Sequence, residues 1–274
     1  MNSKSMYERY GPWALIAGGS EGIGLAFAHQ LAAQGINLIL LARTEQALAE
    51  AAKELRSASA VQVRTHALDL TAEDLLLRLN ETTGDLEIGL LIYNAGAAHG
   101  ADLFHDASLD DALHLVNLNC RGPVVLAHAL GGKMRDRGRG GIILMSSMSG
   151  LSGGAYIAAY TASKSFDITL AEALWAELSP LGVDVLGLIA GATDTPAMGR
   201  AGVVLGQNAM QSREVALEGL AALGREPVHV AGEGNRTFAG MLRSSERQQP
   251  IEMMSQGAAA MFGKTYPHVE LSID

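Results

Sequence analysis

The chain of 274 residues is short of cysteine, long apolar runs and positive charge, and each shortage excludes a class of protein. Cys120 is the single cysteine, so no internal disulfide forms, which fits a reducing cytoplasm. No apolar run reaches the ~20 residues of a membrane span, and the N-terminus MNSKSMYERY lacks the apolar stretch of a signal peptide. The net charge of −9 repels polyanions. We therefore expect a soluble cytoplasmic protein that binds neither nucleic acid nor membrane.

Apolar residues are plentiful, at 48% of the chain, and they occur in short runs of strand length. Stretches rich in Ala, Leu and Glu, typical of helices, separate these runs. The runs begin at Trp13, Asn37, Val61, Leu86, Gly141 and Val183, and PVHVAG is a later candidate. Strands that are apolar throughout are buried on both faces, so the pattern predicts an α/β fold, a single domain with a doubly wound parallel sheet between two layers of helices. In such sheets ligands bind beyond the carboxyl ends of the strands.

The stretch LIAGGSEGIG places four glycines where the first run turns into a helix, and three of them have the spacing Gly18-x-x-x-Gly22-x-Gly24. Gly18 allows a tight turn, Gly22 lets the backbone approach a pyrophosphate, and Gly24 permits close contact between helix and sheet. The helix N-terminus then offers free N–H groups to the phosphates of a Rossmann-like site. The residues between the glycines, Ser20, Glu21 and Ile23, are expected to border the same ligand. Such turns also arise from packing alone, and the spacing is not the commoner G-x-G-x-x-G.

Three further motifs follow in the same chain. LLIYNAG ends on the small-residue turn Asn94, Ala95 and Gly96. Ser147 ends the run GIILMSS, and thirteen residues later Tyr160 and Lys164 lie four positions apart on a predicted helix. Positions i and i+4 share one face of a helix, so the phenol and the ammonium can point into one site. The alternative is an ordinary surface pair.

With these four motifs in this order, the chain resembles the short-chain dehydrogenase/reductase family over about residues 10–191. The resemblance implies one Rossmann-type domain over 1–274, with residues 10–191 as the cofactor-binding and catalytic core. Residues 192–274 would supply the substrate loop, the last strand and the C-terminal tail. Tyr160 would be the catalytic acid/base, Lys164 its partner and Ser147 the group that positions the substrate oxygen. Asn119, in NLNCRGPVVLAHAL, would hold a water in a proton path. No metal is expected.

The resemblance also implies a nicotinamide cofactor, held by the glycine turn and by the ends of the later strands. Besides residues 94–96, Tyr160 and Lys164, the implied contacts are Asp69, Leu70, Gly191, Thr193 and Thr195, the last at the carboxamide. Asp69 has an alternative role beside the start of a helix. The family pattern is altered at Ala17, Tyr93 and Ala190, but no reacting group is lost.

The end of the second run decides which cofactor is preferred. An NAD enzyme would place Asp or Glu there to hold the ribose hydroxyls, whereas this chain has Ala42 followed by Arg43. A guanidinium suits a 2′-phosphate, so we expect NADP(H), with NAD(H) possible. Glu21 argues the other way because its carboxylate repels that phosphate, and Arg43 is alternatively a solvated surface charge.

The chemistry explains why a lysine is needed. A phenol with an ordinary pKa near 10 is a poor base at neutral pH, so a nearby positive charge must lower that pKa. Lys164 and the oxidised nicotinamide would supply the charge.

Within the short-chain dehydrogenase/reductase family, the chain most resembles the branch of hydroxysteroid dehydrogenases and very-long-chain 3-oxoacyl reductases. The resemblance implies a bulky apolar alcohol or ketone, such as a hydroxysteroid, as the substrate. The alternative activity is that of a 3-oxoacyl-type or other carbonyl reductase. The resemblance also implies a homodimer or homotetramer.

Other interpretations of the sequence stay open. GLSGG is a G-x-S-x-G, and Ser152, Asp194 and His229 follow the order of a serine hydrolase. A protein that senses NADP(H) without turnover is another class. His99 and His105 either border the substrate or are solvated. Residues 198–261, with their methionines, form either a lid over an apolar substrate or ordinary core and subunit contacts.

Overall fold

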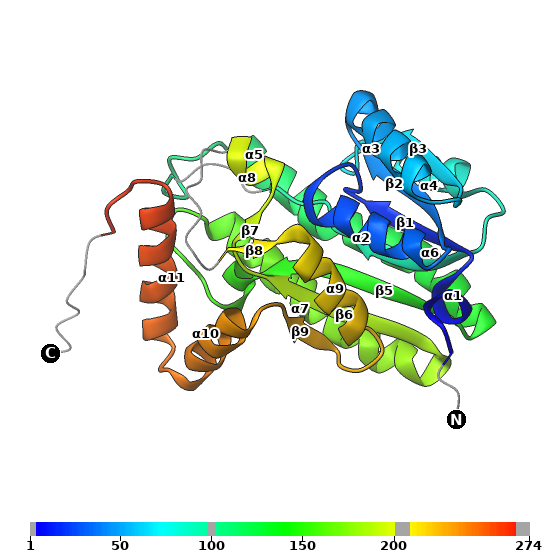
Figure 1. Cartoon of the computed structure of the whole chain (residues 1–274). Coiled ribbons are helices and arrows are strands. Elements are labelled where there is room, and N and C mark those ends of the chain that lie inside the picture. Colours follow the sequence, from blue (N-terminus) through cyan, green and yellow to red (C-terminus); the bar gives the residue numbers. More distant parts are fainter. Residues whose placement is uncertain (1–3, 98–101, 201–208, 267–274) are drawn as a thin grey trace, which may run out of the picture.

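A computed structural model of the chain, which describes residues 4–97, 102–200 and 209–266, contains a seven-stranded sheet (Figure 1). Every pair of neighbouring strands in it is parallel, in the order β3-β2-β1-β4-β5-β6-β9. The strands are β1 (Trp13–Ala17), β2 (Asn37–Ala42), β3 (Val63–Ala67), β4 (Ile88–Tyr93), β5 (Gly140–Ser147), β6 (Val183–Ala190) and β9 (Val228–Val230). The strand order reverses between β1 and β4, and ligands of such sheets bind outside the carboxyl ends at this point. The predicted doubly wound parallel sheet is confirmed.

Alternating side chains along the strands pack against two layers of helices. Ile16 of β1 belongs to the apolar cluster under α2 (Gly22–Ala33), α3 (Glu45–Ala58) and α9 (Ser212–Ala222). Its neighbour Leu15 belongs to the cluster under α4 (Leu75–Thr83), α6 (Gly122–Arg137) and α7 (Ala158–Leu178). Successive residues of a strand point to opposite faces, so both layers are buried and the strands are apolar throughout.

One long helical segment crosses from the region of the site to the far end of the sheet. It consists of α5 (Leu109–Val116), the π-helical turn η1 (Asn117–Arg121) and α6. The remaining elements before β9 are α1 (Met6–Tyr10), η2 (Met148–Leu151), η3 (Ser179–Leu181), β7 (Thr193–Asp194), α8 (Pro196–Arg200) and β8 (Met210–Gln211). The parallel pair β7–β8 was not predicted, because two residues are too few to show a period of two.

The chain ends in two helices, α10 (Glu233–Ser244) and α11 (Gln248–Met261). Figure 1 shows α11, in red, standing at the edge of the molecule rather than on the sheet. It is held by the loop before α7, where the backbone N–H of Ala155 donates to the hydroxyl of Ser255 over 2.9 Å. None of the helices in the described ranges is long and apolar enough to cross a membrane.

Candidate active site

The glycine turn between β1 and α2 is packed so closely that side chains do not fit. Gly18 has φ +79° and Gly22 has φ +57°, a left-handed backbone that favours glycine. A Cβ on Gly24 would lie 2.0 Å from the carbonyl oxygen of Gly18, which itself accepts a hydrogen bond of 2.9 Å from Nδ2 of Asn94. A Cβ on Gly18 would lie 2.8 Å from the backbone of Ala95. The turn is thus joined to the end of β4, and Gly24 packs on the turn rather than on the strands.

A cavity of about 610 Å³ lies above this turn, where the strand order reverses. Most residues predicted to hold the cofactor line it: Gly18, Ser20, Glu21, Gly22, Ile23, Arg43, Asp69, Leu70, Asn94, Ala95, Gly96 and Thr195. Its size is within the range of small-molecule and cofactor pockets. Its floor is a cradle of glycine backbone beside a helix N-terminus, the arrangement that a pyrophosphate needs. The residues present therefore fit a dinucleotide.

Lys164, Asn119 and Gly96 meet beside this cavity. The ammonium of Lys164 donates to the carbonyl oxygen of Met145 over 2.9 Å. A Cβ on Gly96 would lie 3.4 Å from Nζ of Lys164 and 3.5 Å from Oδ1 of Asn119. These are ordinary contact distances, so a Cβ there would touch both side chains, and a longer side chain would need further room. Glycine keeps this space open between the ammonium, the amide and the cavity.

Asn119 lies in the π-helical turn and is fully buried. Its Nδ2 donates to Oγ of Ser163 over 2.9 Å and to the carbonyl oxygen of Ala97 over 3.2 Å, and its Oδ1 accepts from the N–H of Ala97 over 3.3 Å. The amide is occupied by protein partners and joins the turn after β4 to α7. Isolated π-turns of this kind are frequent at functional sites.

Tyr93, a departure from the family pattern, supports the same π-turn. Its hydroxyl donates to the carbonyl oxygen of Leu118 over 2.6 Å, which satisfies a carbonyl that the π-turn displaces. A Cβ on Gly122 would lie 2.1 Å from that hydroxyl oxygen, so glycine is required there. Burial, and next the carboxylate of Asp167, raise the pKa of the Tyr93 phenol, which keeps it a neutral donor.

Ser147 and the pair Tyr160 and Lys164 come from neighbouring elements. Ser147 ends β5 half-buried, and its Oγ accepts from the N–H of Ser149 over 3.2 Å. The preceding Ser146 donates to the carbonyl oxygen of Lys164 over 2.7 Å, which ties the end of β5 to α7. Tyr160 is on the first turn of α7 and Lys164 on the second. The predicted helix beneath both side chains is therefore present.

Asp167 is a part of the site that the sequence analysis missed. Its Oδ2 accepts from Nζ of Lys164 over 2.8 Å, and the two side chains are 2% and 7% exposed. Burial raises the pKa of Asp167 to about 6, against the lowering effect of the Lys164 charge. The available signal in the sequence was a carboxylate three residues after the lysine, a spacing that brings the two side chains together on a helix.

The charges around the nucleotide end of the cavity form two pairs of opposite sign. Glu21 is held by Arg200 of α8, with Nη1 to Oε2 at 2.9 Å, so the repulsion expected from Glu21 is offset. The pKa of Asp69 is lowered, mainly by a hydrogen bond from the N–H of Thr71. The nearby positive charge of Arg43 lowers this pKa further. Arg200 carried no signal in the sequence, because it lies far along the chain from Glu21.

Gly191 and Thr193 lie outside the lining of the cavity. A Cβ on Gly191 would lie 2.5 Å from the amide of Asn235, and the Thr193 hydroxyl donates to the carbonyl oxygen of Gly191 over 3.0 Å. Both residues therefore shape the turn after β6. Thr195 faces the cavity, and its Oγ1 accepts from the N–H of Met198 over 3.3 Å.

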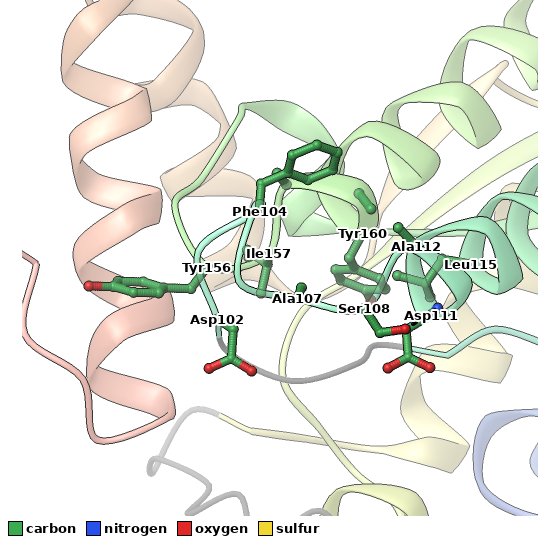
Figure 2. A pocket seen from close by; sticks show the side chains of 12 residues that line it. Asp102, Phe104, Ala107, Ser108, Asp111, Ala112, Leu115, Tyr156, Ile157 and Tyr160 are labelled. Atoms are coloured by element: carbon green, nitrogen blue, oxygen red, sulfur yellow. Dashed lines mark hydrogen bonds between the residues drawn. The ribbon is translucent and has the colours of Figure 1, made fainter.

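A second hollow, of about 80 Å³, lies next to Tyr160, between the start of α7 and α5 (Figure 2). Its apolar wall consists of Phe104, Ala107, Ala112, Leu115, Ile157, Ala158 and Ala159, and its polar wall includes Asp102, Ser108, Asp111 and Tyr156. Ser108 also caps α5, where its Oγ accepts from the N–H of Asp111 over 3.4 Å. The hollow is too small to enclose a whole bulky molecule.

Several alternatives from the sequence find no support. Both ring nitrogens of His229 are bonded to glutamates, to Glu218 at 2.9 Å and to Glu226 at 2.6 Å. Ser152 is buried, and its Oγ has no partner in the part of the chain that the structure describes. A hydrolase triad through Ser152 is therefore wrong. His105 is exposed and absent from both linings, and His99 lies outside the described residues.

The methionines of residues 198–261 do not act as one unit. Met210 is buried in the core beside Gly232. A Cβ on Gly232 would lie 2.7 Å from the sulfur of Met210. The backbone of Met254 on α11 packs near Gly154, and a Cβ on that glycine would lie 3.5 Å from it. Met241 and Met261 are exposed. Residues 201–208 lie outside the described ranges.

Dinucleotide-dependent oxidoreductases are the class of protein that this fold and cavity define. Comparison with known proteins agrees. The profile of the family described as short chain dehydrogenase matches residues 12–202, which is more than half of the chain. The chain therefore belongs to the short-chain dehydrogenase family, whose members use NAD(P) and act as oxidoreductases on CH–OH groups.

Individual relatives lie in the expected branch. The chain is 31% identical over 265 residues to a 7beta-hydroxysteroid dehydrogenase of Clostridium sardiniense, covering 96% of this chain and 98% of that one. It is 36% identical over 183 residues to a very-long-chain 3-oxoacyl-CoA reductase of Neurospora crassa, covering 65% of this chain and 55% of the fungal protein.

Solved structures give the same grouping. A 7beta-hydroxysteroid dehydrogenase superposes with a TM-score of 0.86 at 26% identity, covering 92% of this chain and 99% of that one. A short-chain dehydrogenase from Sphingobium yanoikuyae in complex with NADPH has a TM-score of 0.74 at 29% identity, with 86% and 97% covered. A bulky-bulky ketone specific alcohol dehydrogenase from Comamonas testosteroni has 0.73 at 28%, with 86% and 95% covered.

Proposed function

We propose that the protein interconverts a secondary alcohol and a ketone on a bulky apolar substrate such as a hydroxysteroid, with NADP(H). The observation that carries the proposal is the meeting of Lys164, Asn119 and Gly96 beside a dinucleotide-sized cavity. Lys164 lies on α7, the helix that also carries Tyr160. The cofactor, when bound, supplies the carbon that accepts or donates the hydride. The remaining steps belong to side chains of this chain.

Tyr160 is proposed to take the hydroxyl proton of the alcohol, or to return it to the ketone oxygen. Lys164 favours the phenolate by its charge, and Ser147 holds the substrate oxygen by a hydrogen bond. The side chain of Asn119 is occupied by Ala97 and Ser163. It therefore acts as a brace, and a water in the proton path would be bound by the backbone of the π-turn. This differs from the role that the sequence suggested for the amide.

Two observations support NADP(H) as the preferred cofactor. Arg43 lines the cavity at the end of β2, where no carboxylate follows Ala42 to hold the ribose hydroxyls. Arg200 offsets the charge of Glu21, which removes the objection to a phosphate at this end. The NADPH complex of the Sphingobium yanoikuyae relative agrees with this preference.

The substrate class is supported by the apolar wall beside Tyr160 and by the relatives. We propose that an apolar part of the substrate packs against Leu115 and Ile157, which line the same hollow as Tyr160 (Figure 2). The 7beta-hydroxysteroid dehydrogenases and the bulky-ketone enzyme point to large alicyclic or aromatic ketones. The similarity to the fungal 3-oxoacyl-CoA reductase makes a 3-oxoacyl thioester the second candidate.

A homodimer or homotetramer is proposed from exposed apolar side chains on α5, α6 and α7. These residues are between 37% and 69% exposed, and we propose that they form one apolar patch that contacts a second copy of the chain. They are Leu109, Leu113, Val116, Val124, Phe166 and Trp175. Size-exclusion chromatography with light scattering would measure the state, and a monomer at micromolar concentration would contradict the proposal.

The function is tested by a panel of steroid, bulky aromatic and 3-oxoacyl substrates with both nicotinamide cofactors, followed at the nicotinamide absorbance band. Tyr160→Phe is expected to lower kcat by at least about a thousandfold, because it removes the proton carrier, while cofactor affinity changes little. Retained activity in this variant would refute the mechanism. Tight NADP(H) binding without turnover of any panel member would instead indicate a cofactor sensor.

A further inference from the structure

Asp167 is a buried carboxylate that the proposed chemistry leaves unexplained. Its Oδ2 accepts from Lys164 over 2.8 Å, but its Oδ1 is buried and accepts no hydrogen bond from any residue in the described ranges. A buried carboxylate oxygen without a partner is costly, even when the other oxygen is paired. An apolar residue would avoid that cost, but it would leave the buried ammonium of Lys164 bonded only to the carbonyl oxygen of Met145. The position of this charge directly against Lys164 therefore points to a role in the site.

Other ionisable groups lie on the elements packed against α7. Burial first, and then Asp167 itself, raise the pKa values of the Cys120 thiol on η1 and of the Tyr93 phenol on β4. Strand β5 and the turns η2 and η3 carry no ionisable side chain. The remaining groups on elements packed against α7 are Asp110, Asp111 and His114 on α5, Arg121 on η1, Asp184 on β6 and His229 on β9. Arg121, Asp184 and His229 are engaged by other residues.

Lys164 has three N–H donors, and two of them are used by partners among the described residues. One bonds the carbonyl oxygen of Met145 and one bonds Oδ2 of Asp167. The ammonium lies 3.4 Å from the position of a Cβ on Gly96, on the side of the cavity. We propose that the third donor serves the site formed with the cofactor and Tyr160. Without Asp167, the long lysine side chain would be fixed at one point only.

We infer that Asp167 is a positioning residue of this site: it holds the ammonium of Lys164 and offsets part of its charge, and thereby sets the pH at which Tyr160 gives up its proton. The inference rests on the proposed function of Tyr160 as the base. Its sign follows from the charges. A negative carboxylate beside the ammonium weakens the attraction between that ammonium and a phenolate, so Asp167 moves the titration of the phenol to higher pH.

The pKa of Asp167, raised to about 6 by burial, fits this role. Near neutral pH the carboxylate is ionised and offsets Lys164. As the pH falls through about 6 it takes up a proton, and the full charge of Lys164 then acts on the site. The unpaired Oδ1 is free to carry that proton. The charge beside Tyr160 therefore changes with pH in a range where an exposed aspartate would not change.

The test compares Asp167→Asn with Asp136→Asn, a control on α6 whose side chain is 68% exposed. Phenolate absorbance is titrated without cofactor in each protein, and the curve of the same protein carrying Tyr160→Phe is subtracted, which isolates Tyr160. The midpoint in Asp167→Asn is expected about one pH unit lower than in the unchanged protein. The control is expected to leave the midpoint in place. The pH profile of alcohol oxidation should move in the same direction.

Equal midpoints in Asp167→Asn and the unchanged protein would overturn the inference. Asp167→Leu tests it again with a side chain suited to burial, and it should lower the midpoint too. If neither variant folds, a pH titration of the unchanged protein tests the inference by NMR. The signal of 13C-labelled Tyr160 is assigned through Tyr160→Phe, and its chemical shift must show an inflection near pH 6. The absence of that inflection would refute the proposal. Because these titrations need no turnover, their outcome is independent of whether the substrate class is correct.

Discussion

Gly24→Ala is the sharpest test of how the glycine turn is built. The added methyl group would lie 2.0 Å from the carbonyl oxygen of Gly18 and 2.8 Å from Nδ2 of Asn94. Carbon and oxygen approach no closer than about 3.3 Å even in weak hydrogen bonds, so the turn must move by more than about 1 Å. That movement breaks the 2.9 Å bond between Asn94 and Gly18, which joins β4 to the turn.

The expected cost is about 3 kcal/mol in the free energy of unfolding, from overpacking and from the lost hydrogen bond. Denaturant unfolding measures it, and fluorescence titration with NADPH should show at least about a tenfold loss of affinity, because the backbone donors are displaced. Gly240→Ala on α10 is the matched control. No atom lies within 4 Å of its Cβ position, so it is expected to stabilise the helix by about 0.5–1 kcal/mol. Equal unfolding midpoints and equal affinities in the two variants would refute the account of the turn.

Two further substitutions test the cofactor preference and the packing of the N-terminus. Arg43→Ala is expected to weaken NADP(H) binding by about 10- to 100-fold and NAD(H) binding far less, because a charge-assisted hydrogen bond to the phosphate is lost. Calorimetric titration with each cofactor measures the two affinities, and equal losses would contradict the proposed preference. Tyr10→Phe removes the 2.8 Å bond from a buried hydroxyl to Asp184. It should lower the free energy of unfolding by about 1–2 kcal/mol, whereas Tyr7→Phe, at an exposed tyrosine, should change nothing; the same loss in both would rule out this explanation.

The proposed chemistry depends on how a lysine is kept charged in a nearly buried place. Removing an ammonium from water is costly unless it is paired and hydrogen-bonded. Met145 and Asp167 supply those partners, one from the sheet and one from the same helix. Replacing Lys164 would therefore disturb Asp167 as well as Tyr160, so the effects of single substitutions in this group should not add.

The nucleotide end of the cavity shows a related arrangement at the surface. Glu21 and Arg200 form an exposed ion pair between the glycine turn and α8. Exposed pairs of this kind contribute little to stability, about 0–1 kcal/mol. Their importance here is the local charge, because Arg200 offsets the repulsion that Glu21 alone would exert on the phosphate that we propose Arg43 to hold.

The sequence alone determined the sheet and the order of the motifs along it. Strands such as β1 and β4 are apolar at every position, because both faces are covered by helices, and that leaves an unmistakable pattern. The glycine turn and the spacing from Tyr160 to Lys164 are also local, since one turn of helix sets their geometry. The short pair β7–β8 escaped prediction because two residues carry no period.

Only the tertiary structure decided what each of these residues touches. Asp167 is three residues from Lys164, and its sequence neighbourhood does not say whether the pair faces solvent or the sheet. The packing of α7 against the sheet and η1 buries the pair. The bonds of Asn119 to Ala97 and Ser163, and of Glu21 to Arg200, join residues far apart in the chain. Such contacts follow from the packing of whole elements, whose relative positions no local pattern of residues encodes.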